Sequence, residues 1–303
     1  MDKWSVGLED NFMCATDRAL RKGTLYVVAT PIGNLEDITL RAIRILKEVQ
    51  LIAAEDTRRT KKLLHAHGIH TPLISLYEQN ERKKSSFLIA KMNDGMDVAY
   101  VSDAGTPGIS DPGYVLIRQA IANTIRVVPI PGVSAVIAAL SVSGLPMNSF
   151  VFNGFLPGRA VKRKQFLMSA KDETRTMVFY ESPKRLMSTL SDVEEVLGDR
   201  EIVISRELTK AFEEILRGRV GGLISLLQDR IVKGEVTLLI AGKEEPSCSD
   251  GEIRVRFKQL RKNTDLTQRD IIDMIVGEMV VSRKRVYREA VKAEDKRKEP
   301  LFP

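Results

Sequence analysis

Residues 101–113 read VSDAGTPGISDPG and continue an apolar run, 98–101, that predicts a buried strand. The three glycines and two prolines are typical of a tight, rigid loop, since glycine lets a ligand approach the backbone closely and proline fixes the chain direction. In open parallel α/β sheets, ligands bind beyond the carboxyl ends of the strands. The stretch therefore predicts such a sheet with a binding loop at its edge. The alternative is a stiff surface connection without a ligand.

Strands alternate with helices on both sides of this loop. Short apolar runs bounded by turn-forming or acidic residues predict strands at residues 23–29, 51–54, 72–76, 97–102 and 125–130. The stretches between and after them predict helices at residues 40–49, 61–66, 82–92, 114–122 and 136–142. This order predicts a parallel, doubly wound α/β sheet, whose loops at 30–34, 55–60, 102–111 and 130–135 all leave one edge.

A second α/β region follows GLP at residues 144–146, with strands expected at 150–155, 176–180, 201–205 and 235–241. Beyond it, TQRD at 267–270 resembles a capping box, and two short helices are expected, separated by Gly277 and with Ser282 as the second cap. The expected organisation is a leader without periodicity at 1–22, an N-terminal α/β domain at 23–145, a second α/β domain at 146–242, a linker at 243–253 and a basic helical appendage at 254–303.

Positive charge is concentrated at the end of the chain. The sequence carries 47 Lys and Arg against 40 Asp and Glu, and from Arg254 onward the counts are 14 and 8. A basic helix suits a nucleic-acid clamp, although two helices that staple the second domain would explain the same residues. The expected phosphate contacts are Arg58, Arg59, Lys61, Lys62, Lys162, Arg163, Lys164 and the basic residues of 283–288.

Several protein classes are disfavoured because their motifs are absent. No apolar run approaches the roughly 18 residues of a membrane span, and charged residues occur in the first 22 positions in place of a signal core, so a cytoplasmic location is expected. The sequence has no phosphate-binding GxxxxGKS or GxxxxGKT, no GxGxxG after the first strand and no GxSxG. Cys14 and Cys248 lack CxxC spacing, and His65, His67 and His70 do not share a helical face, so neither a disulfide framework nor a metal site is expected.

Six motifs are distinctive in their order: GTLYVVATPIGNLED at 23–37, AEDTRRT at 54–60, SDAGTPGISDPG at 102–113, PGVSA at 131–135, FYESPKR at 179–185 and RELTK at 206–210. Together they resemble the ribosomal small-subunit methyltransferase I family of the tetrapyrrole methylase superfamily. The resemblance spans about residues 23–242, and residues 264–294 also resemble the small helical appendage of that family. LYEQNE at 76–81 departs from the usual YHEHNE, so Tyr77 and Gln79 stand where the family has histidines.

The resemblance implies two α/β domains, of which the first has a parallel, doubly wound sheet and the second a mixed sheet, followed by a helical appendage. It implies a homodimer that transfers a methyl group from S-adenosylmethionine, bound in the cleft between the domains, to the ribose 2′-hydroxyl of one cytidine in the decoding centre of 16S ribosomal RNA. By motif position, it implies cofactor contacts at Pro31, Ala104, Gly105, Thr106, Ile109, Ser134, Ala135, Glu181 and Gly218.

The chemistry of methyl transfer indicates candidate catalytic residues. A sulfonium cation favours nearby carboxylates, and a ribose hydroxyl, as a weak acid, needs a base or a cation near its oxygen. Asp103, Glu207 and Lys210 are the candidates. Asp103 could instead cap its own loop, and Glu207 and Lys210 could form a structural ion-pair network with Arg206. Two other functions stay open here: a methylase of the same fold that acts on a tetrapyrrole, and a non-catalytic RNA-binding assembly factor.

Overall fold

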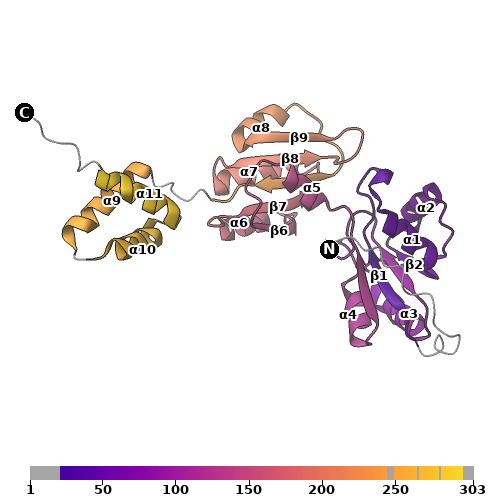
Figure 1. The fold of residues 1–303 in the computed structure, drawn as a ribbon. Coiled ribbons are helices and arrows are strands. Elements are labelled where there is room, and N and C mark those ends of the chain that lie inside the picture. The colour runs from indigo at the N-terminus through magenta and orange to yellow at the C-terminus, as the bar shows by residue number, and fades with distance from the viewer. Residues whose placement is uncertain (1–20, 244–248, 265, 280, 296–303) are drawn as a thin grey trace, which may run out of the picture. The chain divides into compact units, whose positions relative to one another are not determined.

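The computed structural model describes residues 21–243, 249–264, 266–279 and 281–295. The chain forms two compact units, Met1–Lys243 and Glu244–Pro303 (Figure 1). The first unit contains two five-stranded sheets, and the described part of the second is helical. Residues 1–20 of the expected leader lie outside the described residues, as do Cys14 and Cys248.

The first sheet is parallel throughout, with the strand order β3-β2-β4-β1-β5. Its strands are β1 Thr24–Val28, β2 Leu51–Ala54, β3 Leu73–Ser75, β4 Val98–Val101 and β5 Arg126–Ile130. The helices that alternate with them are α1 Leu40–Glu48, α2 Thr57–Ala66, α3 Glu81–Asn93, α4 Tyr114–Ala122 and α5 Ala135–Ser141. The predicted parallel, doubly wound sheet is confirmed.

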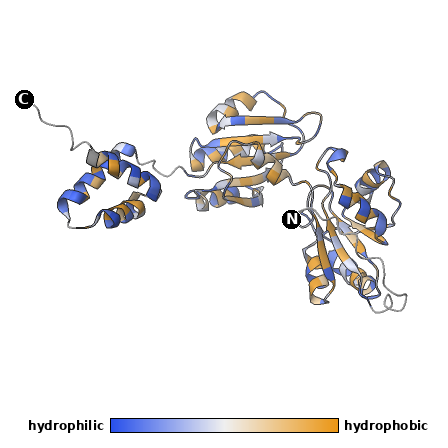
Figure 2. Cartoon of the chain, viewed as in Figure 1, coloured by the Kyte–Doolittle hydropathy of each residue, from blue (hydrophilic) through white to orange (hydrophobic). Residues whose placement is uncertain are grey.

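Helices cover both faces of the first sheet. One core cluster joins Leu46 of α1 and Leu64 of α2 to Ile52 of β2. Another joins Leu88 of α3, together with α4, to Tyr100 of β4. Because both faces are covered, all four residues of β4 are buried, and its sequence is a continuous apolar run rather than an alternating one. Figure 2 shows hydrophobic residues along the strands of both sheets.

Helix α2 begins at Thr57, earlier than the expected Lys61. The Asp56 side chain accepts a hydrogen bond from the backbone N–H of Arg58 at 2.8 Å and so caps the helix. The expected loop at 55–60 is therefore mostly the first turn of a helix. This places Arg59 and Lys62 on a helix at the carboxyl end of the sheet, where a loop would have left them without a defined direction.

The second sheet has the order β6-β7-β10-β8-β9, with β6 and β7 parallel and the other pairs antiparallel. Its strands are β6 Phe150–Phe155, β7 Thr176–Glu181, β8 Glu201–Arg206, β9 Glu214–Arg219 and β10 Val236–Ile240, and its helices are α6 Ala160–Ser169, α7 Leu186–Leu197 and α8 Val220–Leu227. The mixed sheet implied by the resemblance is confirmed. Strand β9 and helices α7 and α8 are additional to the elements predicted from the sequence.

Helix α5 packs on the second sheet, although the expected domain boundary assigned it to the first domain. Val136 and Leu140 of α5 belong to one apolar cluster with Val178 of β7, Val203 of β8 and Leu239 of β10. The opposite face of this sheet is covered by α6, α7 and α8. The loop that leads from β5 into α5 therefore connects the two sheets and brings their edges to one site.

The second unit has three helices in its described residues: α9 Asp250–Asn263, α10 Gln268–Met279 and α11 Arg283–Asp295. Helix α9 is capped by Ser249 and lies partly in the expected linker, so the prediction of only two helices was wrong. Gly277 does not break α10. The predicted caps agree with the structure, since Thr267 Oγ1 accepts a hydrogen bond from Asp270 N at 3.3 Å and Ser282 immediately precedes α11.

Candidate active site

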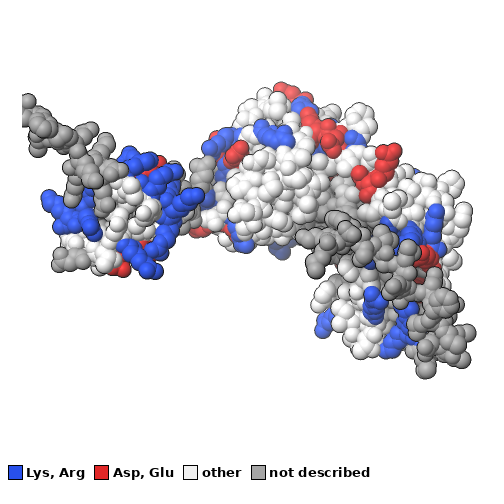
Figure 3. Space-filling model, in the orientation of Figure 1, with Lys and Arg blue, Asp and Glu red and all other residues white. Residues whose placement is uncertain are grey.

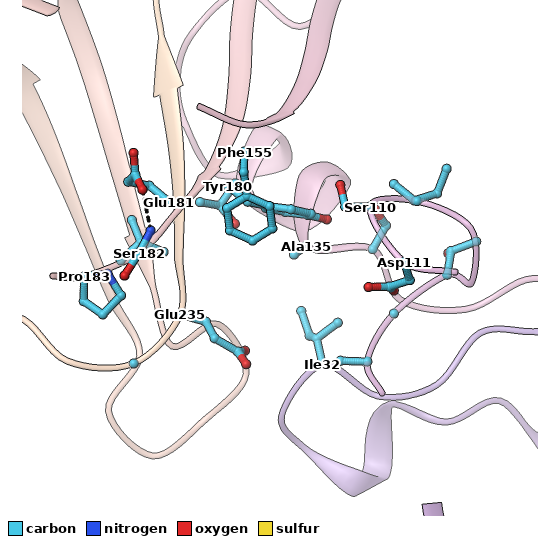
Figure 4. Close-up of a pocket in the computed structure, with 18 residues that line it drawn as sticks. Ile32, Ser110, Asp111, Ala135, Phe155, Tyr180, Glu181, Ser182, Pro183 and Glu235 are labelled. Atoms are coloured by element: carbon cyan, nitrogen blue, oxygen red, sulfur yellow. Dashed lines mark hydrogen bonds between the residues drawn. The ribbon is translucent and has the colours of Figure 1, made fainter. Parts of the chain in front are cut away.

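A cavity of about 310 Å³ lies where the loops of the two sheets meet (Figure 4). The first sheet supplies the loops after β1 and β4, the loop before α5 supplies Ser134, and the second sheet supplies the ends of β6 and β7 and the start of β10. The lining residues are Ile32, Ala104, Gly105, Thr106, Ile109, Ser110, Asp111, Ser134, Ala135, Phe155, Tyr180, Glu181, Ser182, Pro183, Gly234, Glu235, Val236 and Thr237. We call this space the first cavity. Its position agrees with the binding edge predicted for a parallel sheet.

The loop after β4 is held rigidly against the loop after β1. Thr30 N donates to Gly105 O and Gly105 N donates to Thr30 O, both at 2.9 Å. Gly105 has a φ of 75° and Gly108 a φ of 81°, which glycine adopts without strain, while Ser110 reaches 66° with a side chain. The loop thus forms a wall of the cavity.

Most of the cavity wall is apolar. Phe155 and Tyr180 form a tilted ring pair with centroids 5.5 Å apart, and Ile32 faces them from the first sheet (Figure 4). A mainly apolar cavity with few polar groups is typical of a small-molecule site. The flat ring surfaces suit the stacking of a heteroaromatic base.

The charged side chains that line the first cavity are all acidic. The Asp111 carboxylate points into it (Figure 4), and burial raises its pKa, with a further contribution from the neighbouring charge of Asp103. Glu55 lies behind the same loop, and its pKa is raised by burial and then by Asp111 and Asp103. Carboxylates that repel one another in this way are stabilised by a cation placed between them or beside them.

The carboxylate of Glu181 lines the first cavity but is bonded to other groups of the protein. Its side chain is fully buried, and its oxygens are held by Arg185 Nη2 at 2.6 Å, Thr189 Oγ1 at 2.7 Å and the backbone N–H of Ser182 at 2.6 Å. Figure 4 shows the bond to Ser182 turning the carboxylate away from the cavity centre. Glu181 therefore lines the cavity, as expected from its motif, but its charge is already satisfied by protein groups.

A second cavity of about 270 Å³ adjoins the first. Its walls combine the apolar side chains of Pro31, Leu35 and Leu63 with polar and charged groups, namely Thr30, Arg59, Thr60, Lys62, Ser102, Asp103 and Lys210. Ile32, Ala104 and Glu235 line both cavities. We call this space the second cavity. It differs from the first in having three cationic side chains.

Residues 206–210 form a segment with a strained backbone that contributes Lys210 to the second cavity. Glu207 and Thr209 have positive φ angles of 51° and 65°, which are uncommon for residues with side chains and typical of functional sites. Lys210 Nζ lies 2.9 Å from Glu207 Oε1 and 3.0 Å from Glu235 Oε2. Burial lowers the pKa of Lys210, but hydrogen bonds to Glu207 and Glu235 outweigh it and raise the pKa overall. The ion-pair network that the sequence left open is therefore present.

The structure gathers most of the predicted site residues. Ala104, Gly105, Thr106, Ile109, Ser134, Ala135 and Glu181 line the first cavity, and Pro31, Asp103 and Lys210 line the second. Glu207 lines neither cavity, and its Oε1 is held by Lys210 Nζ and by the backbone N–H of Glu235, both at 2.9 Å. Gly218 lies on the edge strand β9, outside both linings.

The lining residues that were not singled out from the sequence include Asp111, Phe155, Tyr180 and Glu235. Asp111 and Tyr180 lie inside quoted motifs, so their motif positions were the available signal. Phe155 and Glu235 stand at strand ends of the second sheet, and only the pairing of the strands brings them to the cavity.

Several of the expected phosphate contacts are held in ion pairs, among them two on helix α6. Arg163 is buried, and its guanidinium lies 2.6 Å from Asp192 Oδ2, so its predicted contact with RNA was wrong. Lys164 lies 2.6 Å from Glu195. An amphipathic helix places one of three consecutive cations toward the core, and α6 places Arg163 there.

The second unit carries many cations, and ion pairs within the unit hold several of them. The carboxylate of Glu289 is fully buried beneath Arg254, Arg288 and Lys292, and Asp250 and Asp273 pair with Arg285 and Arg283. Within the described part of this unit, no acidic side chain pairs with Lys258, Arg261, Lys262, Arg269 or Lys284. Lys and Arg side chains cover much of the face of this unit that Figure 3 presents.

No group of His, Cys, Asp and Glu that could hold a metal ion is found among the described residues. In the same residues, no helix is both long and apolar enough to cross a membrane.

Comparison with known proteins identifies the class of the fold. The family model "Tetrapyrrole (Corrin/Porphyrin) Methylases" matches residues 24–224. A cobalt precorrin-4 methyltransferase of cobalamin biosynthesis superposes with a TM-score of 0.55 at 16% identity, covering 72% of this chain and 94% of that one. A uroporphyrin-III C-methyltransferase from Thermus thermophilus gives 0.52 at 18% identity, covering 73% and 98%. The two sheets and the cavity between them are those of a tetrapyrrole methylase.

More similar relatives narrow the assignment. A protein from Halalkalibacterium halodurans named ribosomal RNA small subunit methyltransferase I is 51% identical over 224 residues, 74% of this chain and 78% of that protein. Proteins of the same name from Pseudomonas aeruginosa and Thermotoga maritima are 45% and 49% identical, covering 86% and 73% of this chain and 89% and 100% of theirs. The chain belongs to the ribosomal RNA small subunit methyltransferase I family. The protein is a methyltransferase. The whole Thermotoga protein matches only 222 residues of this chain.

Proposed function

We propose that the protein transfers the methyl group of S-adenosylmethionine to the ribose 2′-hydroxyl of a cytidine in the decoding centre of 16S ribosomal RNA. The observation that carries this proposal is the pair of joined cavities. The first is apolar and acidic, which suits a cationic methyl donor, and the second is lined by Arg59, Lys62 and Lys210, which suit a polyanion. The names of the relatives supply ribosomal RNA as the polyanion.

The first cavity fits S-adenosylmethionine in size and in chemistry. Its volume of about 310 Å³ lies within the usual range for small-molecule sites. Phe155 and Tyr180 offer flat surface to the adenine, the Asp111 carboxylate suits the sulfonium, and Gly105 leaves the backbone open to approach. When bound, the cofactor supplies an electrophilic methyl group on a positively charged sulfur.

The residues of the chain would act chiefly by positioning. Methyl transfer needs the acceptor oxygen near contact distance, roughly 3–3.5 Å from the methyl carbon, so a rigid pair of cavities contributes much of the acceleration. Ile32 and Ala104 form the apolar part of the boundary and exclude water from it. Arg59 and Lys62 hold phosphates without reading sequence.

We further propose that the acceptor is the RNA within the small ribosomal subunit, and that the protein acts in the cytoplasm as a homodimer. Lys258, Lys262 and Lys284, which pair with no acidic side chain in the described part of the second unit, would add phosphate contacts. Sedimentation of the purified protein tests the dimer.

The proposed function is tested by supplying S-adenosylmethionine with a labelled methyl group to three acceptors: small subunits lacking the modification, naked 16S RNA and a tetrapyrrole precursor. We expect label on the subunits, at one nucleotide. Label on the tetrapyrrole alone would contradict the proposed acceptor while keeping the methyltransferase. Cofactor binding without any transfer would instead favour a non-catalytic assembly factor.

A further inference from the structure

The boundary between the two cavities contains one group that can accept a proton. Ile32, Ala104 and Glu235 are the residues that line both cavities, and Glu235 is the only one of these with a titratable side chain. If donor and acceptor occupy adjoining cavities, the methyl group crosses this boundary, and the acceptor hydroxyl lies beside it. A base for that hydroxyl must be within hydrogen-bond reach of the same place.

The other carboxylates of the site are less well placed. Asp111 lines only the first cavity, and Asp103 lines only the second. Asp103 is also held in the wall, because its Oδ1 accepts from Asp56 N at 2.9 Å and its Oδ2 lies 3.3 Å from Arg59. Glu207 lines neither cavity, and the carboxylate of Glu181 is satisfied by protein groups.

The carboxylate of Glu235 is accessible to a ligand and is held in one orientation. Its side chain is 69% exposed, and Oε2 lies 3.0 Å from Lys210 Nζ. Among the described residues, nothing donates a hydrogen bond to Oε1. Figure 4 shows the carboxylate pointing from its loop toward the side of the cavity that holds Ile32. One oxygen is therefore fixed, and the other is left for a ligand.

Lys210 is fixed in turn by the strained segment 206–210 and by the loop after β1. Asn34 N donates to Thr209 Oγ1 at 3.0 Å, and a Cβ on Gly33 would lie only 2.4 Å from Lys210 Cγ. The loops touch closely enough that only glycine fits at residue 33. The strained backbone at Glu207 and Thr209 thus positions the Lys210 ammonium, which orients Glu235.

The second cavity has the chemistry of a ribose-phosphate chain. Lys62 is exposed and has no acidic partner among the described residues, and Arg59 is also exposed at the cavity rim. Pro31, Leu35 and Leu63 provide apolar surface for the flat face of a sugar or base. Cations and carboxylates line the same cavity, which matches the phosphodiester and the hydroxyl groups of a ribose-phosphate chain.

We propose that the second cavity holds the acceptor nucleotide and that Glu235, at its boundary with the first, accepts the proton of the hydroxyl that is methylated. This rests on the proposed function. The oxygen of the hydroxyl forms a bond to the methyl carbon, the bond from that carbon to sulfur breaks, its electron pair stays on sulfur, and the hydroxyl proton moves to Glu235. Charge balances, since the sulfonium becomes a neutral thioether and the carboxylate becomes a neutral acid.

The test compares the wild type with Glu235→Gln, Glu36→Gln and Lys62→Met on small subunits that lack the modification. Glu36 is the matched control, because it is an exposed carboxylate in the loop after β1 that lines neither cavity. Single-turnover transfer is measured across pH. Binding of S-adenosylhomocysteine and, separately, binding of subunits to the cofactor-free protein are measured by calorimetry and filter retention.

We expect Glu235→Gln to slow transfer by about 10²–10⁴-fold, because general-base assistance has that size. Its affinity for S-adenosylhomocysteine and for subunits should match the wild type, and Glu36→Gln should match it in every respect. Lys62→Met should weaken subunit binding and lower the salt slope of log K by about 1, as expected when one phosphate contact is lost.

The inference would be overturned by wild-type transfer in Glu235→Gln, or by unchanged subunit binding in Lys62→Met at every salt concentration. Loss of S-adenosylhomocysteine affinity in Glu235→Gln would also overturn it, since Glu235 would then serve the cofactor. If the wild type itself transfers no methyl to subunits, the proposed function fails, and the role of Glu235 fails with it.

Discussion

Alanine substitutions at two glycines in the loop after β4 distinguish the free-energy cost of backbone strain from the cost of side-chain overlap. Gly108 has a φ of 81°, and nothing lies within 4 Å of where its Cβ would be. Gly113 has a φ of 124°, and its Cβ would lie 2.4 Å from Cε1 of Tyr100. We predict that Gly113→Ala destabilises the first unit far more than Gly108→Ala does.

The expected magnitudes follow from these contacts. A residue with a side chain at a sparsely populated φ costs about 1–3 kcal/mol, and overpacking a core adds about 1–3 kcal/mol. The ring of Tyr100 cannot turn away easily, because it is fully buried and its hydroxyl donates to Pro112 O at 2.6 Å. Gly108→Ala should therefore cost about 1 kcal/mol by strain alone, and Gly113→Ala about 4 kcal/mol by strain and overlap together.

Thermal and urea unfolding followed by circular dichroism measure this difference. For a unit of this size, about 1 kcal/mol corresponds to roughly 2–4 °C in Tm, so Gly113→Ala should lower Tm by roughly 10 °C and Gly108→Ala by roughly 3 °C. Equal shifts for the two variants would refute the reasoning, because they would mean that the overlap with Tyr100 costs nothing.

Other predictions concern charge and the second unit. Arg163→Met should lower the free energy of unfolding by about 3 kcal/mol in urea titrations, because it leaves the buried Asp192 without its main partner, while subunit binding stays unchanged; weaker subunit binding would restore Arg163 as an RNA contact. Since burial raises the pKa of Asp111, the ionised form that suits a cation is lost as pH falls, beginning above the ordinary aspartate range. Cofactor affinity measured by calorimetry should fall with pH in that direction, and Asp111→Asn should abolish the dependence. Deleting residues 249–303 should leave S-adenosylhomocysteine binding intact, because the whole Thermotoga relative matches only 222 residues of this chain. The same deletion should weaken subunit binding. Unchanged subunit binding would assign the second unit another role.

Regular periodicity made much of the fold predictable. The strands of the first sheet are short apolar runs and its helices are amphipathic, so the predicted elements differ from the structure mainly at their ends. Strand β9, EILRGR, was not predicted, because an edge strand that is half exposed carries charges where a buried strand would not. Helix α9 was not predicted, and its first residues, 250–253, were assigned to the linker, although Ile253, Phe257 and Leu260 recur at helical spacing and are buried.

The site was predictable where motifs lie on single loops, and unpredictable where strands bring distant residues together. The loop at 102–111 and residues 134 and 135 were placed correctly at the cavity. Glu235 was missed because its role depends on two neighbours from other segments, Lys210 and Ile32. Arg163 was wrongly assigned to RNA, because its partner Asp192 is 29 residues away and only packing shows which of three adjacent cations faces inward.

The measurement that tests the central claim most directly is alkaline hydrolysis of 16S RNA from subunits treated with the wild-type protein and S-adenosylmethionine. Alkali cleaves RNA through attack by the ribose 2′-hydroxyl, so a 2′-O-methyl group leaves one linkage uncleaved. The account predicts a single resistant linkage, after a cytidine, that appears only with protein and cofactor together. An unbroken ladder in which transferred label remains on a base would contradict ribose methylation and the role assigned to the two cavities.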